Sequence, residues 1–181
     1  MVSQLKVNEI IKQSGSSITI GESGDTITLP STSTLTNFPE NTPAFAVKQA
    51  SGPGISNGIS TKATFDTTEF DTDSAFDSTN NRFVVPTGKG GKYYFQGYTS
   101  IPGIDAGEIG QLFFQKNNSG TILHTVVRNY LQGTNQLFRM TSSFTIELSE
   151  GDFIELFLYQ NSGSGQNVTN TFFTGFKLIG P

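Results

Sequence analysis

Short segments in which apolar and polar residues alternate, separated by turn-forming residues, recur along residues 43–181. Alternation with a period of two places successive side chains on opposite faces of a β-strand. Phe144, Ile146 and Leu148, for example, alternate with Thr145 and Glu147. The pattern predicts an all-β domain. The clearest candidate strands are residues 43–49, 61–70, 82–85, 92–100, 109–116, 121–130, 137–148, 153–160 and 171–179.

The composition agrees with many short strands. Charged residues make up 14% of the chain, against about 25% in typical domains, and amphipathic helices need charged outer faces. Aromatic residues reach 12%, with 16 Phe, so there is enough apolar bulk for a dry core. These figures argue against a helical bundle, a coiled coil and a disordered chain.

Charge and motif content exclude several classes of function. The net charge is −4 and the sequence pI is about 4.9, so we expect no nucleic-acid partner. No apolar run is long enough for a transmembrane helix and no signal peptide is visible, so we expect no membrane insertion. The absence of Cys excludes disulfides, thiolate nucleophiles and thiolate metal ligands.

The connectors of residues 43–181 alternate in length. Tight turns are expected at residues 89–91, 117–120 and 149–152, and longer loops at 101–108, 131–136 and 161–170, with 50–58 and 71–81 also long. Successive connectors of antiparallel strands fall at opposite ends, so we expect all tight turns at one end and all long loops at the other. Function in such architectures sits on loops held by a rigid scaffold.

One predicted strand, residues 153–159, is apolar on nearly both faces. One face can pack on the core of a sandwich. The other then needs a cover, which we expect to be either an outer loop or a partner subunit.

Residues 1–42 carry a different pattern, a strand-and-turn unit repeated at nine-residue spacing. Ile18 and Ile20 are followed nine residues later by Ile27 and Leu29. A single strand of this kind buries only two side chains and cannot persist alone, whereas three copies around an axis could bury all four residues. We therefore predict an attachment arm and a short trimeric shaft. A flexible Ser/Thr linker is the alternative.

Residues 43–181 resemble the globular head of complement subcomponent q, a jelly roll related to tumour necrosis factor. The landmarks that carry the resemblance occur in order at residues 43–45, 65–70, 76–77, 81–86, 91–95, 148–152 and 172–179. The resemblance implies a ten-stranded antiparallel jelly-roll sandwich that forms homotrimers, with both termini at the base and loops at the apex. Two features depart from the family: no collagen-like repeat precedes the head, and the loop at 131–136 lacks the carboxylates through which some members bind calcium.

The stretch at residues 24–31 is similar to N-terminal segments of tail fibres and other appendages of bacteriophages, marine ones in particular. The two resemblances together imply a non-enzymatic trimeric virion protein, assembled in the host cytoplasm and carried on the extracellular particle. We expect a tail fibre or spike whose head adheres to a host surface glycan or protein, and whose arm binds other virion proteins. The alternatives are a capsid decoration or cement trimer, and a soluble cellular complement-q-like binding protein.

The expected receptor contacts lie on the predicted apical loops. These candidates are Asp105, Glu108, Gln132, Asn135, Gln166 and Asn167. No cofactor is expected, although Asp105 and Glu108 of three subunits could form a ring of carboxylates for Ca²⁺, whose ligands are oxygens.

Other candidate sites have simpler interpretations. His124 is the one histidine and lies in a predicted strand without a nucleophile-elbow motif, so we interpret it as structural. For the carboxylates at residues 66, 69, 71 and 73, we favour the interpretation that they solvate the surface over the alternative of a weak cation site.

Overall fold

The computed structural model describes residues 23–24, 26, 28, 41–129 and 133–178. The chain divides into two units, Met1–Phe38 and Pro39–Pro181, and the account below concerns the second, called the head. The predicted shaft residues Ile18, Ile20, Ile27 and Leu29 lie outside the described residues, so the shaft and its boundary at residue 42 stay predictions.

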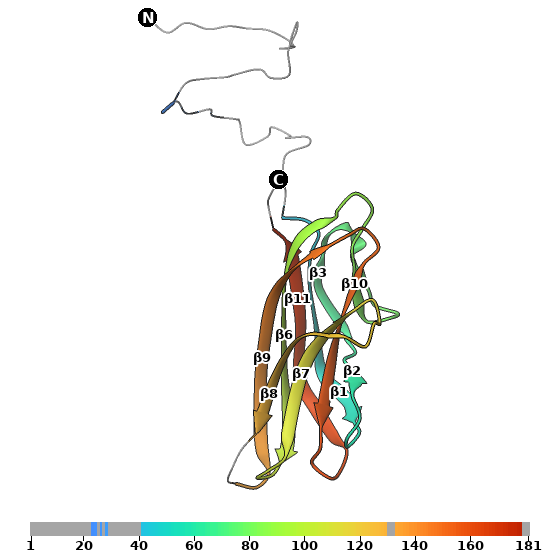
Figure 1. Cartoon of the computed structure of the whole chain (residues 1–181), viewed down its shortest axis with the longest axis vertical. Helices are drawn as coiled ribbons and strands as arrows, with labels where there is room; N and C mark the ends of the chain where they lie inside the picture. The colour runs from blue at the N-terminus through green and yellow to red at the C-terminus, as the bar shows by residue number, and fades with distance from the viewer. Residues whose placement is uncertain (1–22, 25, 27, 29–40, 130–132, 179–181) are drawn as a thin grey trace, which may run out of the picture. The chain divides into compact units, whose positions relative to one another are not determined.

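The head is a sandwich of two antiparallel sheets (Figure 1). The first sheet has the order β3 (Thr67–Asp71), β1 (Ala44–Ile55), β11 (Gln166–Lys177), β6 (Gly91–Ile104) and β9 (Gln136–Leu148). The second has the order β4 (Phe76–Asp77), β5 (Arg82–Val84), β10 (Phe153–Gln160), β7 (Ile109–Lys116) and β8 (Ile122–Asn129), and β2 (Thr61–Lys62) also pairs with β10. The predicted jelly-roll sandwich is confirmed.

The described part of the chain contains eleven strands rather than ten. The predicted strand at residues 61–70 is two strands in different sheets, and β4 is a further short strand that was not among the nine candidates. Residues 61–62 pair with β10, and residues 67–71 pair with β1. Between them, the Ala63 N–H donates to the Leu156 carbonyl and the Asp66 N–H donates to the Lys48 carbonyl. The chain therefore crosses from the second sheet to the first within a few residues. Besides the strands, the described residues form one short 3₁₀ turn, η1 (Thr72–Ser74).

Phenylalanine rings join the inner faces of the two sheets. Phe45 of β1 lies 5.1 Å from Phe83 of β5 and 4.8 Å from Phe173 of β11, measured between ring centroids. All three side chains are fully buried. Phe114 of β7 packs within 5.8 Å of the same Phe173 ring. These contacts make one continuous core that holds both sheets in a fixed relation.

The outer face of β10 makes side-chain contacts with neighbouring strands of its own sheet. The Arg82 guanidinium lies 4.4 Å above the Phe153 ring, and Phe157 stacks on Phe113 at 5.5 Å. Between these rings, Glu155 is buried. Phe153, Phe157 and Tyr159 on this face are only partly buried, so the cover by an outer loop or a partner subunit stays a prediction.

Candidate binding surface at the loop end

Four connectors meet at one end of the head, which we call the loop end (lower end of Figure 1). Their described parts are residues 56–60, 105–108, 133–135 and 161–165. The Ala106 N–H donates to the Gly133 carbonyl at 2.9 Å, and the Gly163 N–H donates to Asn57 Oδ1 at 2.8 Å. Connectors that are distant in sequence are therefore bonded to one another as a surface.

The tight connectors gather at the opposite, turn end. Residues 85–90, 117–121 and 149–152 bond to one another there: the Val85 N–H donates to the Asp152 carbonyl at 2.8 Å and the Asn117 side chain donates to Asp152 Oδ1 at 2.7 Å. The Lys89 ammonium donates to Thr42 Oγ1 at 3.2 Å, so the chain enters the head at this end. The predicted division of these connectors between opposite ends is confirmed. The predicted difference in length is not: the connectors at residues 105–108 and 161–165 are no longer than those at 85–90 and 117–121, because β6 continues to Ile104 and β11 begins at Gln166.

One long connector departs from that rule. The segment at residues 71–81 lies at the turn end, where Asp73 Oδ1 is 3.5 Å from the Lys89 ammonium. It joins β3 of the first sheet to β4 of the second, so its length spans the two sheets instead of projecting a loop. The expectation that all long loops share one end is wrong for this segment.

A buried amide organises one half of the loop end. Gln160, at the end of β10, is fully buried, and its Nε2 donates to the carbonyls of Ile55 and Ser164 at 3.1 and 2.8 Å. Its Oε1 accepts the Ser162 N–H at 2.6 Å. A buried side-chain amide whose donors and acceptor are all engaged fixes the backbone around it, so Gln160 holds the β10–β11 connector against the end of β1.

The candidates Asp105, Glu108 and Asn135 lie together in the other half. Asp105 Oδ1 accepts the Asn135 N–H at 2.6 Å, and Glu108 Oε2 accepts the Asp105 N–H at 2.7 Å. Asn135 has a φ of 52°, a left-handed conformation that Asn tolerates better than most residues. Each acid therefore has one oxygen committed to backbone N–H groups and stabilises its own loop.

Gln166 and Asn167 begin β11 beside these loops. Gln166 Nε2 lies 2.9 Å from Ser162 Oγ and 3.1 Å from Ser164 Oγ, so it braces the β10–β11 connector from within the strand. Asn167 is exposed and pairs with Gly54 of β1. The candidate Gln132 lies outside the described residues.

The loop end is polar and nearly free of positive charge. Within residues 56–60, 103–108, 133–136 and 161–167, as far as they are described, there is no Lys or Arg and the charged residues are Asp105 and Glu108. Ile59, with an exposed fraction of 59%, is the one large apolar side chain exposed there. Sequence reasoning missed both Gln160 and Ile59. An amide that ends an otherwise apolar strand was the available signal for Gln160.

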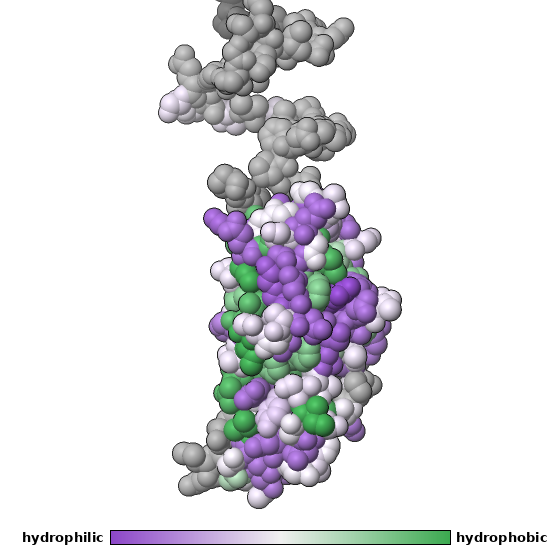
Figure 2. Space-filling view, turned by 45° about the vertical axis from the view of Figure 1, so that its right-hand side comes forward, coloured by the Kyte–Doolittle hydropathy of each residue, from purple (hydrophilic) through white to green (hydrophobic). Residues whose placement is uncertain are grey.

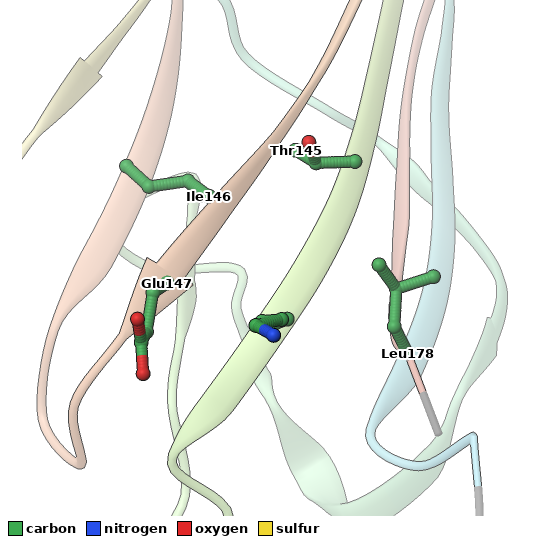
Figure 3. Close-up of a pocket in the computed structure, with 5 residues that line it drawn as sticks. Thr145, Ile146, Glu147 and Leu178 are labelled. Atoms are coloured by element: carbon green, nitrogen blue, oxygen red, sulfur yellow. The ribbon is translucent and has the colours of Figure 1, made fainter. Parts of the chain in front are cut away.

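A shallow hollow of about 240 Å³ lies near the turn end (Figure 3). It is lined by Thr145, Ile146 and Glu147 of β9, by Lys92 of β6 and by Leu178. Figure 3 shows Leu178 across from Thr145 and Glu147. Lys92 and Glu147 are cross-strand partners. The hollow adjoins the outer face of the first sheet, because Thr145 is the cross-strand partner of Tyr94, whose side chain lies on that face.

The remaining candidates have structural environments. His124 Nδ1 is 2.7 Å from Ser142 Oγ, and the imidazole stacks on Phe144 with 6.0 Å between ring centroids. Among the described residues, no group of three or more His, Cys, Asp and Glu could hold a metal ion. Within the same residues, no helix has the length and apolarity needed to cross a membrane.

The carboxylates of residues 66–73 do not converge on one point, because they contact different partners. Glu69 pairs with Lys48, and Asp71 accepts the backbone N–H groups of Ala75 and Phe76 at 2.9 and 3.1 Å. These contacts anchor β3 and the turn that follows it.

The comparisons with known proteins bear on the fold. No family model and no curated protein matches the chain. Among solved structures, it is similar to the globular domain of zebrafish complement 1qA protein, with a TM-score of 0.59 and 17% identity. The match covers 77% of this chain and 99% of that chain. The head thus has the complement-q-like jelly-roll fold that its sequence landmarks resemble.

Proposed function

We propose that the chain is a non-enzymatic, homotrimeric binding protein whose loop end contacts a ligand, and that it serves as a tail fibre or spike of a virion. The observation that carries the proposal is the bonding of four connectors into one polar surface opposite the end where the chain enters the head. A rigid sandwich that presents bonded loops away from its attachment point has the architecture of a binding module. Three copies side by side would add avidity to weak individual contacts.

The virion context is supported by residues 1–42. Their nine-residue repeat suits a three-chain shaft, and residues 24–31 are similar to phage appendage segments. In this role the shaft joins the head to other virion proteins, and the particle carries the protein outside the cell. A loop end rich in hydroxyl and amide groups, whose charged residues are the acids Asp105 and Glu108, suits a glycan or an uncharged protein surface on the host better than an anionic polymer.

The test is binding of the fluorescently labelled full chain to an array of bacterial surface glycans and to whole bacteria. Asp105→Ala removes the acceptor for the Asn135 N–H, so we expect at least tenfold weaker binding with a native circular dichroism spectrum. Lys92→Ala, at the turn end, is the matched control and is expected to leave binding unchanged. Equal loss in both variants would contradict the loop end as the binding surface.

The virion role has its own test. An antibody against the head should label particles released from a lysed culture that expresses the chain, at the tips of their tails or spikes. Labelling of the entire shell would show a decoration protein instead, and particles free of label would overturn the virion role.

A further inference from the structure

Asn57 is the one asparagine of the chain that is followed by glycine. Such an asparagine reacts readily with its own backbone, because glycine has no side chain to hinder attack by its nitrogen on the asparagine Cγ. Asn57 and Gly58 are both exposed, on the loop-end connector at residues 56–60. The loop end is mostly hydrophilic on the side that faces the viewer in Figure 2. Water, which this reaction consumes, therefore reaches the two residues.

The reaction exchanges the side-chain amide of Asn57 for a carboxyl group. The Gly58 nitrogen gives its proton to hydroxide and attacks Asn57 Cγ, the bond from Cγ to Nδ2 breaks, and ammonia leaves with a proton from water. Water then opens the cyclic imide at either of its two carbonyl carbons, which gives aspartate or isoaspartate. Overall one water is consumed and one ammonia is released, and nothing is oxidised or reduced.

The folded loop end activates the group that is attacked. Asn57 Oδ1 accepts the Gly163 N–H at 2.8 Å. Negative charge develops on this oxygen when a nucleophile adds to Cγ, and a backbone N–H that is already aimed at the oxygen stabilises that charge. The hydrogen bond from Gly163 therefore favours attack on Asn57 Cγ.

The same fold withholds the nucleophile. The Gly58 N–H donates to the Gln160 carbonyl at 2.7 Å, so its proton is protected from hydroxide. The Ile59 N–H donates to the Ser56 carbonyl at 3.4 Å, and Gly58 has a φ of 70° while the φ of Asn57 is not positive, which is the pattern of a type II turn. Ring closure needs the opposite rotation about Asn57 ψ, that of the mirror-image type II′ turn, so the turn must open before the ring can form.

We propose that Asn57 and Gly58 form a self-modification site, which the Gln160 carbonyl keeps unreacted and which deamidates when the loop end opens. The Gln160 side chain takes part in this lock, because it holds the β10–β11 connector that supplies Gly163. Isoaspartate adds a methylene group to the main chain and so displaces the Gly58 N–H from its acceptor. The modification is therefore an irreversible record of opening, and it holds whether or not the loop end binds a ligand.

The rate of deamidation in the full chain tests the lock. Trypsin cleaves after Lys48 and Lys62, and the peptide between these cuts contains Asn57 as its one asparagine, so mass spectrometry of this peptide measures the site. The matched control is the same peptide, free in the same mildly alkaline buffer. We expect the folded chain to react at least tenfold more slowly, because only its opened fraction can react. A folded chain that reacts as fast as the free peptide would overturn the lock, and an unreactive free peptide would overturn the site.

Two variants separate the lock from general stability. Gln160→Leu removes the amide that holds the β10–β11 connector, and it should raise the rate in the folded chain at least threefold while the circular dichroism spectrum stays native. Gln115→Leu changes a glutamine near the turn end of β7, opposite Glu155 of β10, and should leave the rate unchanged. An unchanged rate in Gln160→Leu, or an equal increase in both variants, would overturn the part assigned to Gln160.

Discussion

Replacing Lys62 by Met should destabilise the head far more than the same change at Lys48. Both ammonium groups pair with a glutamate and are equally accessible, with exposed fractions of 36% and 37%. Their partners differ: Glu155 is 6% exposed and Glu69 is 49% exposed. The Lys62 ammonium lies 3.0 Å from Glu155 Oε1, while Oε2 is buried without a hydrogen-bond partner. Lys62→Met would therefore leave a buried carboxylate with no compensating charge.

The magnitude follows from the burial. Removing one partner of a fully buried ion pair costs about 3–5 kcal/mol, and because Lys62 is partly open to water we expect about 2 kcal/mol. The exposed pair of Lys48 should be worth less than about 1 kcal/mol. With a urea dependence of about 2 kcal/mol per molar, the unfolding midpoint should fall by about 1 M for Lys62→Met and by less than half of that for Lys48→Met.

Urea unfolding followed by circular dichroism measures both midpoints. The double variant Lys62→Met/Glu155→Leu removes the carboxylate together with its partner, so it should recover most of the loss. Equal midpoints for Lys62→Met and Lys48→Met would refute the reasoning, because burial of the glutamate would then have no energetic consequence.

Three further predictions concern stability and titration. Gly175→Ala should lower the free energy of unfolding by about 1–3 kcal/mol in urea titrations, because a Cβ there would lie 2.4 Å from Cδ1 of the buried Phe95 ring. Burial acts to raise the pKa of Asp152, but hydrogen bonds, led by that from Lys116, outweigh it and hold the pKa below 3.8. Asp152→Asn should thus cost about 1–2 kcal/mol at pH 7, a difference that vanishes as the pH falls below 3.8 and the native carboxyl protonates. Burial, assisted by a nearby carboxylate, raises the pKa of Tyr93 to about 12, so ultraviolet titration should show one late phenol and stability should fall as the pH rises from 10 to 12.

Each of these has a contrasting result. Gly165→Ala meets nothing nearer than 3.8 Å and should leave the midpoint within about 0.5 kcal/mol; an equal loss there would refute the clash at Gly175. A difference between wild type and Asp152→Asn that persists at pH 2 would exclude the carboxylate as its source. If all phenols ionise together near pH 10, Tyr93 is not buried in solution.

The fold was predictable because alternation and turn residues are local signals. The prediction failed at residues 61–70, where the alternation continues although the chain changes sheet. Ala63 and Phe65 alternate regularly and both pack on the core. The strands on either side of them nevertheless pair with different partners, β10 and β1. Alternation reports which face is buried, not which neighbour a strand bonds to. The early start of β11, at Gln166, was hidden because Val168 is its one buried apolar residue before Thr171.

The loop end was predictable in its location and less so in its construction. The connector lengths placed Asp105, Glu108 and Asn135 near one another, but as free contact residues, whereas both acids accept backbone N–H groups. The role of Gln160 in holding the β10–β11 connector depends on its hydrogen bond to the Ile55 carbonyl, which is 105 residues away in sequence. Such a contact exists only once the sheets are assembled, so the local signal at Gln160 does not identify its partner.

The position of β1 has a mechanical consequence. β1 is the strand by which the chain enters the head, and it is hydrogen-bonded on both sides, to β11 along residues 44–55 and to β3 along residues 45–48. A pull between the chain's entry at the turn end and a ligand held at the loop end acts along the axis of this strand. The ladder bonds run across that axis, so they share the force in shear and cannot be opened one at a time. A head anchored in this way resists being unzipped from its own attachment point.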